Sequence, residues 1–306
     1  MIRVVSWNIN KKQEPWCVLA TMAERGEADV ALLQEAGSPP AEASGLIEYD
    51  DQVFWNRNLY DRWPLFVRLS DRVQVEWLRQ APPNSDLDER TIGVSGIGTL
   101  AAARVIPRDQ PQNAFLVFSM YARWMRSHPT TGKSWIYADG SAHRILSDLS
   151  VFIDYMNPNE QRILAAGDLN MFFGATGKEL SVPEREETVW TRFKALGLEF
   201  IGPQSPNGNP AATRQPDVPT DSQNVPTYHT IHQTPAKANR QLDYAFASRD
   251  FHNTVSVRAL NKPNEWGSSD HCRLDFHCIK SCTSLSNSSS KGSKWPSRRA
   301  APTASR

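Results

Sequence analysis

The sequence predicts an α/β protein in which two β-sheets pack together and helices lie outside them. Short runs of apolar and β-branched residues alternate with turn residues along most of the chain. Few segments carry apolar residues at helical spacing, and there is no internal repeat. With 306 residues, of which 40% are hydrophobic and 22% charged, the chain has an ordinary globular balance and is long enough for a large core.

Ten segments are predicted to be strands, because each is short, apolar and bounded by turn residues. In chain order they are Ile2–Trp7, Val30–Leu33, Leu65–Leu69, Val73–Trp77, Thr99–Val105, Phe115–Met120, Ile163–Ala166, Leu242–Ala247, Val255–Ala259 and Arg273–Cys278. Several of them end directly in polar or charged residues.

Three helices are predicted between the strands. The first begins near Pro15, which suits a first helical turn, and continues with apolar residues at helical spacing. The second covers Ala142–Asn157, where one apolar stripe runs up to Pro158. The third covers Glu184–Leu196, before Gly197.

Two long segments, Arg123–Gly140 and Gly202–Asn239, have no regular pattern. Loops of this length within a compact domain are usually functional or mobile. From Ser281 the composition changes to Ser, Lys, Arg, Pro and Ala, with too few apolar residues to offset the entropy of ordering. We therefore expect one globular domain over residues 1–280 and a disordered tail over residues 281–306.

The formal net charge is +1, so no global positive field attracts nucleic acid, and any polyanion must bind a local patch or metal ions. Four cysteines show neither paired metal-binding spacing nor a dense disulfide framework: Cys17, Cys272, Cys278 and Cys282. Reduced, mostly buried thiols are expected, and they fit a cytoplasmic location. No signal-peptide pattern and no stretch of about 20 apolar residues occurs, so no membrane association is expected.

The polar residues after one predicted strand indicate a functional site. The run Leu164-Ala165-Ala166-Gly167-Asp168-Leu169-Asn170 is apolar until the glycine, and then carries an acid and an amide two positions apart. Residues i and i+2 of an extended chain project to the same side. Asp168 and Asn170 are thus predicted to face a metal ion and a phosphate.

Five other polar clusters lie at strands: three follow a strand, one interrupts a strand and one comes just before the last strand. They contain Asn8, Glu35, Tyr121, Asp243, and the pair Asp270 and His271. Alone, Asn8 would be read as a turn residue and Glu35 as a solvated loop acid. Asp243, however, interrupts a hydrophobic strand, and a charge there is costly unless a cation or donor faces it.

These clusters, in this order, resemble the endonuclease/exonuclease/phosphatase superfamily. It includes DNase I-like nucleases, exonuclease III-like abasic-site nucleases, inositol polyphosphate phosphatases and neutral sphingomyelinases. The resemblance runs from Trp7 to His271. It implies a four-layered α/β sandwich, with two packed, mainly antiparallel β-sheets flanked by helices, and a metal-dependent phosphoesterase.

The resemblance also implies the metal site. Glu35 matches the acid that binds the catalytic divalent cation, usually Mg²⁺, with Mn²⁺ as an alternative. Asn8 matches the amide beside that ion, and Asp270 matches an acid near it. Magnesium keeps several waters and needs few protein carboxylates, so these three side chains offer enough suitable oxygen ligands to bind it.

The catalytic positions follow from the same resemblance. Asp168 and Asn170 match the pair that orients the attacking water and the scissile phosphate, and Tyr121 matches a phenol that contacts phosphate. His271 matches the catalytic histidine, and Asp243 the carboxylate that hydrogen-bonds to it. An imidazole backed by a carboxylate can hold a proton near neutral pH. Either Asp168 or His271 could take the proton of the water.

The chain departs from the better-known branches after Tyr121. Abasic-site nucleases carry an asparagine three positions later, where this chain has Trp124, and His128 is out of register with the second histidine of DNase I-like members. Arg123 is either a phosphate contact or a rim residue with a solvated head, and Arg240 either meets phosphate or caps a sheet edge. Trp124 belongs to a loop of cations and aromatics that could grip nucleic acid.

The first functional hypothesis is a monomeric, cytoplasmic, metal-dependent nuclease that acts on DNA more than RNA. The second is a phosphatase or phosphodiesterase acting on a small or lipid phosphoester, which the near-neutral charge favours. The third is a binding module on an inactive nuclease fold. It ranks last, because every matched position keeps a chemically competent side chain.

Overall fold

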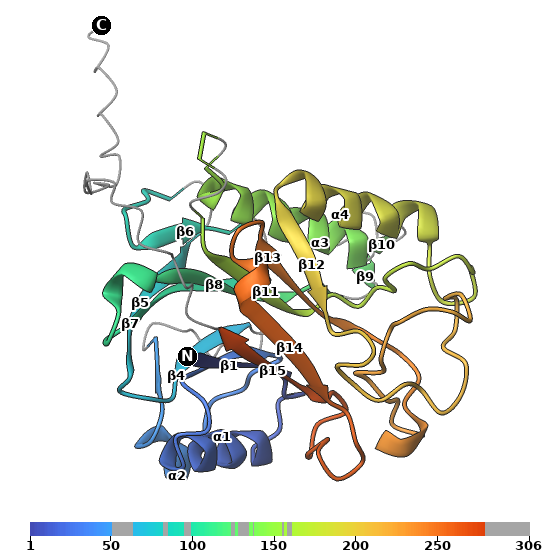
Figure 1. The fold of residues 1–306 in the computed structure, drawn as a ribbon, viewed down its shortest axis with the longest axis horizontal. Helices are drawn as coiled ribbons and strands as arrows, with labels where there is room; N and C mark the ends of the chain where they lie inside the picture. The colour runs from blue at the N-terminus through green and yellow to red at the C-terminus, as the bar shows by residue number, and fades with distance from the viewer. Residues whose placement is uncertain are drawn as a thin grey trace, which may run out of the picture.

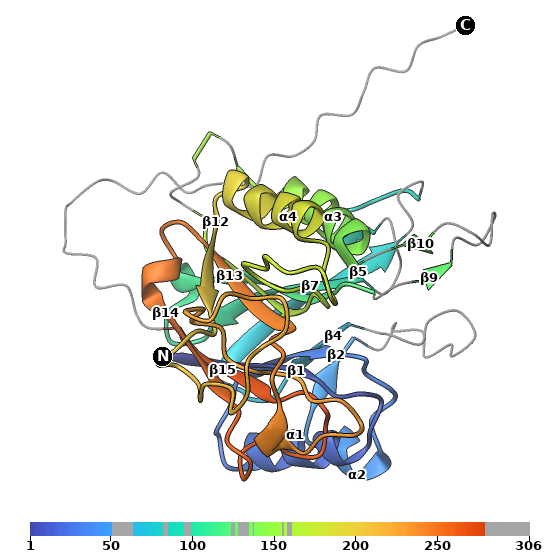
Figure 2. The same ribbon diagram turned by 90° about the vertical axis from the view of Figure 1, so that its right-hand side faces the viewer.

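The computed structural model describes residues 1–50, 64–81, 85–94, 99–123, 126–127, 135–136, 138–154, 156–157 and 161–278. Two β-sheets pack face to face, and helices cover both outer faces (Figures 1 and 2). The arrangement has four layers, as the sequence predicted. The predicted tail over residues 281–306 lies outside the described residues.

The first sheet has the strand order β14-β15-β1-β2-β4-β3. Its strands are β1 (Ile2–Asn8), β2 (Val30–Gln34), β3 (Glu48–Tyr49), β4 (Leu65–Arg68), β14 (Val255–Leu260) and β15 (Arg273–Cys278). β1 and β2 are parallel, and the other neighbours are antiparallel. β2 is buried at every position, as expected of a strand with both faces covered.

The second sheet has the order β12-β13-β11-β8-β7-β5-β6. Its strands are β5 (Val73–Ala81), β6 (Thr91–Gly93), β7 (Leu100–Pro107), β8 (Phe115–Tyr121), β11 (Ile163–Asp168), β12 (Leu198–Gly202) and β13 (Asp243–Ser248). β8 and β11 are parallel, as are β5 and β6, and the other pairs are antiparallel. β9 (Arg126–Ser127) and β10 (Trp135–Ile136) form a separate antiparallel pair.

Helices α1 (Glu14–Glu24) and α2 (Ala41–Ser44) cover the first sheet, whereas α3 (Ala138–Leu149) and α4 (Pro183–Ala195) cover the second (Figure 1). Short 3-10 turns occupy Pro111–Asn113, Ser150–Phe152, Pro235–Lys237 and His252–Thr254. α1 begins with a proline in its first turn, as predicted. α4 agrees with the predicted helix to within one residue at each end.

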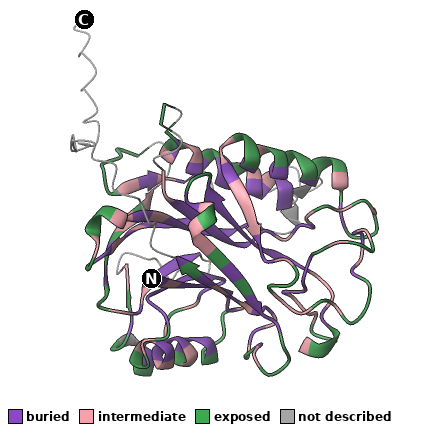
Figure 3. Ribbon diagram, in the orientation of Figure 1, coloured by how far each residue is buried: buried purple, intermediate pink, exposed green. Residues whose placement is uncertain are grey.

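Three apolar layers hold the four structural layers together. One lies between the sheets and includes Val4, Val117 and Phe276. A second packs the first sheet on its helices, and a third packs the second sheet on α3 and α4. Buried residues accordingly concentrate on the strands and on the inner sides of the helices (Figure 3). Each fully buried large apolar side chain contributes roughly 1.5–3 kcal/mol.

The predicted helix over Ala142–Asn157 is wrong at both ends. α3 begins at Ala138 and ends at Leu149, and a 3-10 turn follows. Met156 is 88% exposed, so the apolar stripe does not continue. The carboxylate of Asp154 accepts hydrogen bonds from the amides of Met156 and Asn157, and this local turn replaces the expected helical bonds.

The sequence prediction also missed the short strands β3, β6, β9, β10 and β12, and the helix α2. β5 continues to Ala81, beyond the predicted end at Trp77. β12 pairs only with β13, at the edge of its sheet. Such edge segments depend on a partner strand rather than on their own apolar pattern.

Cys17, Cys272 and Cys278 are free thiols; Cys17 is exposed and the other two are buried. This agrees with the predicted reduced, mostly buried state, although Cys282 lies outside the described residues. Within the described part of the chain, no helix combines the length and the apolar character that crossing a membrane requires.

The topology places the polar strand ends at one edge of the sandwich. The parallel strands β1 and β2 end side by side, with Asn8 paired to Gln34. On the other sheet, Asp168 at the end of β11 pairs with Tyr121 of β8 and with Asp243 of β13. Strand ends from both sheets thus meet at the same edge.

The approach of β11 to β8 requires a glycine before Asp168. Gly167 has φ +152°, and a Cβ atom there would lie 2.0 Å from the carbonyl oxygen of Met120. We predict that Gly167→Ala lowers the free energy of unfolding by about 3 kcal/mol or more, measured by urea denaturation.

Gly45→Ala is the matched control, because Gly45 has φ −83° and open space around it. It should change stability by less than about 1 kcal/mol. Equal urea midpoints for the two variants would contradict the tight packing of β11 on β8.

Candidate active site at the strand ends

Asp168 is the centre of the cluster of polar side chains. One carboxylate oxygen accepts the amide N–H of Asn170 at 3.0 Å, and the other accepts Nδ2 of Asn170 at 2.9 Å and Nδ2 of Asn8 at 3.0 Å. Asn170 adopts φ +50°, a left-handed conformation that asparagine tolerates, and its side chain also donates to the carbonyl of Ala122. The carboxylate of Asp168 is therefore fixed before any substrate binds.

Asn8 connects the two sheets through its side chain. Besides Asp168, its Nδ2 lies 3.4 Å from Oε1 of Glu35, while its Oδ1 accepts the amide N–H of Asn10. Glu35 follows β2 with φ +49° and is 6% exposed, so the chain turns sharply and holds the carboxylate inside the site. Asn8 thus bridges acids that belong to different sheets.

His271 and Asp243 form a buried hydrogen-bonded pair. Nδ1 of His271 and Oδ2 of Asp243 are 2.8 Å apart, and both residues are buried. Nε2 of His271 lies 3.9 Å from Oδ2 of Asp168. Because Asp243 accepts the Nδ1 proton, Nε2 is directed toward Asp168, and one water or phosphate oxygen could contact both groups.

Burial and the neighbouring charges shift the pKa values of Asp168 and His271. Burial raises the pKa of Asp168 to about 7, and the charges of Asp243 and Glu35 act in the same direction, against His271. Burial lowers the pKa of His271, but Asp243 and Asp168 outweigh it and raise that pKa to about 10. The site therefore favours retention of a proton on the imidazole and on the central carboxylate.

The remaining predicted residues lie around this centre. The half-buried Asp270 accepts a hydrogen bond from Oγ of Ser269 at 3.3 Å, and its charge contributes to the raised pKa of His271. Tyr121 is buried beside Asp168 on the neighbouring strand, so the two side chains share a face of the sheet. The structure thus brings the predicted metal and catalytic residues to one edge of the sandwich.

The structure describes two of the three remaining predicted substrate contacts, Arg123 and Arg240. Arg123 is half-buried, and its amide donates to Oγ of Ser141 at 3.0 Å. The carbonyl of Arg240 accepts the amides of Thr227 and Tyr228, and its guanidinium lies near the Tyr228 phenol. Trp124 lies outside the described residues.

Two groups of side chains could hold a divalent cation. Asp168, Asp243 and His271 offer ligand atoms that all lie within 4.8 Å of one another. These atoms already bind each other or the amides of Asn8 and Asn170, and a protonated imidazole is no ligand. The hard oxygen donors of Glu35 and Asp270, beside Asn8, fit Mg²⁺ or Mn²⁺ better in chemistry.

Two features of the site were missed in the sequence. Gln34 is fully buried, and its Nε2 donates to Oγ of Ser119 at 2.9 Å, which ties β2 to β8 directly behind Glu35. Tyr228 packs its ring 4.9 Å from the ring of His271. Only the unusual length of the Gly202–Asn239 segment signalled that a residue within it could reach the site.

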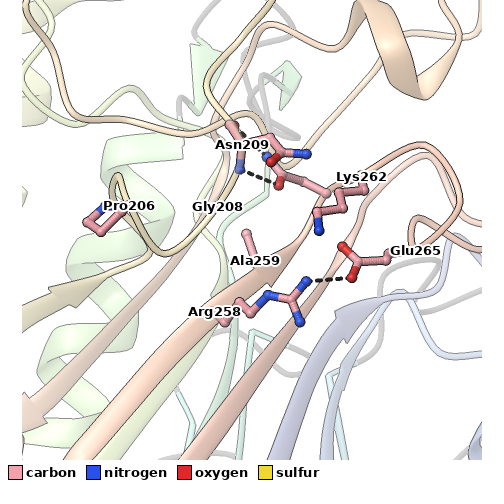
Figure 4. Close-up of a pocket in the computed structure, with 8 residues that line it drawn as sticks. Pro206, Gly208, Asn209, Arg258, Ala259, Lys262 and Glu265 are labelled. Atoms are coloured by element: carbon pink, nitrogen blue, oxygen red, sulfur yellow. Dashed lines mark hydrogen bonds and ion pairs between the residues drawn. The ribbon is translucent and has the colours of Figure 1, made fainter.

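A surface pocket of about 540 Å³ lies next to the edge strand β14 (Figure 4). Its lining residues are Pro206, Gly208, Asn209, Arg258, Ala259, Asn261, Lys262 and Glu265. Arg258 pairs with Glu265, and the side chain of Asn261 binds the backbone of Asn209 in both directions. None of the predicted site residues lines this pocket, so the candidate active site remains at the strand ends.

Comparison with solved structures shows the same fold in other proteins. The endonuclease domain of TRAS1, a telomere-specific non-LTR retrotransposon, aligns with a TM-score of 0.58 and 15% identity over 92% of this chain and 100% of that domain. An AP endonuclease from Archaeoglobus fulgidus aligns with a TM-score of 0.58 and 12% identity over 91% and 99% of the two chains. A mannosyl-6-phosphatase from Bacteroides thetaiotaomicron aligns with a TM-score of 0.52 and 14% identity over 92% and 100%.

No protein-family model matches the sequence, and a search of curated proteins finds no match. At these low identities the structural likeness shows the fold. The chain has the DNase I-like α/β sandwich fold, as the resemblance in the sequence implied.

The raised pKa of Asp168 predicts a pH dependence of stability. Because its folded pKa of about 7 exceeds the ordinary value of 3.8 for an aspartate, the folded state binds more protons between these values, and stability falls as pH rises through this range. Asp168→Asn removes this contribution. In EDTA, we predict that its urea midpoint falls less between pH 5 and 7.5 than that of the wild-type protein.

Asp250→Asn, at an exposed position, is the matched control and should behave like the wild-type protein. If Asp168→Asn kept the wild-type pH dependence, the carboxylate of Asp168 would not be the group that titrates in the fold.

Proposed function

We propose that the protein is a divalent-metal-dependent phosphodiester hydrolase and that it acts as a nuclease. The meeting of Glu35, Asp168 and the His271–Asp243 pair at one buried edge carries this proposal. Acids, amides and an imidazole in one cluster suit the attack of water on phosphorus.

Each residue has a proposed task in this reaction. Glu35, with Asp270 and Asn8, would hold the cation, which supplies charge neutralisation for the phosphate when it is bound. Asp168 is held by Asn8 and Asn170 in position to orient the water.

The His271–Asp243 pair completes this mechanism. Asp243 fixes the ring of His271 so that Nε2 faces the reacting phosphate. Nε2 lies 3.9 Å from Oδ2 of Asp168, so both groups can reach the same water. Oδ2 of Asp168 takes the proton of the water while His271 is protonated, and Nε2 could take it only from the neutral imidazole.

Nucleic acid is the proposed substrate, with DNA favoured over RNA. Two of the similar structures are described as endonucleases, and this supports the assignment. Arg123, Arg240 and Trp124 are the proposed contacts to the nucleic acid, with Tyr121 and Asn170 at the scissile phosphate. We propose a monomer in the cytoplasm, and the free thiols of the described cysteines fit that reducing compartment.

Hydrolysis of a small phosphoester is the second candidate function. The net charge of +1 gives no global attraction for a polyanion, and one similar structure is described as a mannosyl-6-phosphatase. The catalytic centre would be the same in both cases, so only the substrate distinguishes them.

A substrate panel tests the proposed function. We predict that the purified chain cleaves plasmid or single-stranded DNA with Mg²⁺ or Mn²⁺ and loses this activity in EDTA. Gel electrophoresis of DNA and RNA, alongside phosphate release from sugar and inositol phosphates, would measure it. Turnover confined to the small phosphoesters would favour the second candidate, and no turnover of any substrate would refute a hydrolase.

The proposed metal ligand can be tested by an isosteric change. Glu35→Gln removes the charge and keeps the shape, so kcat/KM should fall on the order of 1000-fold, because metal-based stabilisation is worth several kcal/mol. Its melting temperature in EDTA should be no lower than that of the wild-type protein, since a buried charge is lost.

Glu42→Gln, at an exposed position of α2, is the matched control and should retain full activity. Wild-type kinetics and wild-type Mn²⁺ affinity in Glu35→Gln would show that Glu35 holds no catalytic metal.

A further inference from the structure

The backbone of Tyr228 lies between the chain segment that leads to Asp243 and the segment that contains His271. It forms isolated β-bridges with Arg240 on one side and with His271 on the other. Its amide donates to the carbonyl of Arg240, and the next amide, of His229, donates to the carbonyl of Asp270 at 3.0 Å. The backbone of Tyr228 is therefore held by the segments that carry both Asp243 and His271.

The residue before it strengthens this connection. Oγ1 of Thr227 accepts the amides of Leu242 and Asp243, at 3.0 and 3.1 Å. The carbonyl of Thr227 accepts the amide of Cys272 at 2.9 Å. Thr227 and Tyr228 thus form a short link between the start of β13 in one sheet and the start of β15 in the other.

Packing directs the side chain of Tyr228 toward the site. Its ring centroid lies 4.9 Å from that of His271, with an angle of 49° between the rings. On another side the ring packs against the buried cluster of Phe172, Val218 and Leu242. Contacts on two sides leave the ring little freedom, so the position of the hydroxyl group is largely determined.

The phenol lies in the electrostatic field of the candidate active site. Burial raises its pKa, the carboxylates of Asp270, Asp168 and Glu35 raise it further, and Arg240 opposes them. The hydroxyl therefore keeps its proton and acts as a hydrogen-bond donor. Among the described residues, no side chain or carbonyl accepts a hydrogen bond from it, whereas the hydroxyl of Tyr244 binds the carbonyls of Met171 and Gln241.

Besides the proposed contacts Tyr121, Arg123 and Arg240, the site has few donors for an incoming phosphate. The Nδ2 groups of Asn8 and Asn170 already donate to the carboxylate of Asp168. Carboxylates repel a phosphate, so its non-bridging oxygens need a cation or neutral donors. Nε2 of the protonated His271 is one such donor, and the hydroxyl of Tyr228, whose ring packs against the same imidazole, is another.

We propose that the hydroxyl of Tyr228 donates a hydrogen bond to a non-bridging oxygen of the substrate phosphate. Tyr228 is then a substrate-binding residue that works beside His271. This inference rests on the proposed phosphoester hydrolysis, and it applies to a nucleic acid and to a small phosphoester alike, because both present the same phosphate oxygens.

Tyr228→Phe tests the inference, because it removes the hydroxyl and keeps the ring against His271. A hydrogen bond to a charged group supports a loss of about 10- to 100-fold in kcat/KM, with a melting temperature unchanged within about 2 °C. The affinity of inorganic phosphate for the Mg²⁺-loaded protein, measured by calorimetry, should fall about tenfold or more. Tyr49→Phe, in the edge strand β3, is the matched control and should match the wild-type protein in all three measurements.

Two other outcomes for Tyr228→Phe would contradict the inference. Wild-type kinetics and wild-type phosphate affinity in Tyr228→Phe would overturn the inference and leave the proposed hydrolase intact. A lowered melting temperature with unchanged phosphate affinity would assign Tyr228 a structural role and would also overturn it.

Calorimetry separates the two proposals. If the wild-type protein hydrolyses no phosphoester but binds phosphate, the loss of affinity in Tyr228→Phe still supports the contact while the hydrolase fails. If the wild-type protein neither hydrolyses phosphoesters nor binds phosphate, both proposals fall.

Discussion

The candidate site depends on a hydrogen bond between the two sheets. Nδ2 of Asn8, at the end of β1, donates to Oδ2 of Asp168, at the end of β11, over 3.0 Å. The buried bond from Gln34 to Ser119 joins β2 to β8 in the same way. Because these strands belong to different sheets, the geometry of the acids depends on how the sheets pack, and the apolar layer between them sets that packing. The large core is thus a requirement of the site as well as of stability.

The buried charges of the candidate site lower the stability of the folded state. Glu35, Asp168 and Asp243 are all buried, and the one imidazole among them already binds Asp243. Taking several like charges out of water costs free energy, which the raised pKa of Asp168 reflects. A bound cation would offset part of this cost. The unfavourable charge and the proposed metal affinity therefore have the same physical origin.

Local signals predicted most of the fold and most of the site. Polar residues that directly follow an apolar strand, as at Asp168 and Asn170, are visible in the sequence because strand geometry sets where they point. The strand β12 and the residue Tyr228 were missed because neither has a local pattern. β12 exists through its pairing with β13, and Tyr228 reaches the site only through bridges to two distant segments.

The strand ends that form the candidate site do not determine the choice of substrate. Proteins described as endonucleases and one described as a sugar phosphatase share this fold with the chain, at TM-scores from 0.52 to 0.58. A centre built from strand ends can attack phosphorus in any phosphoester, so it does not distinguish among substrates. Discrimination has to come from segments between the strands. The Gly202–Asn239 segment is one of them, since it carries Tyr228 to the ring of His271.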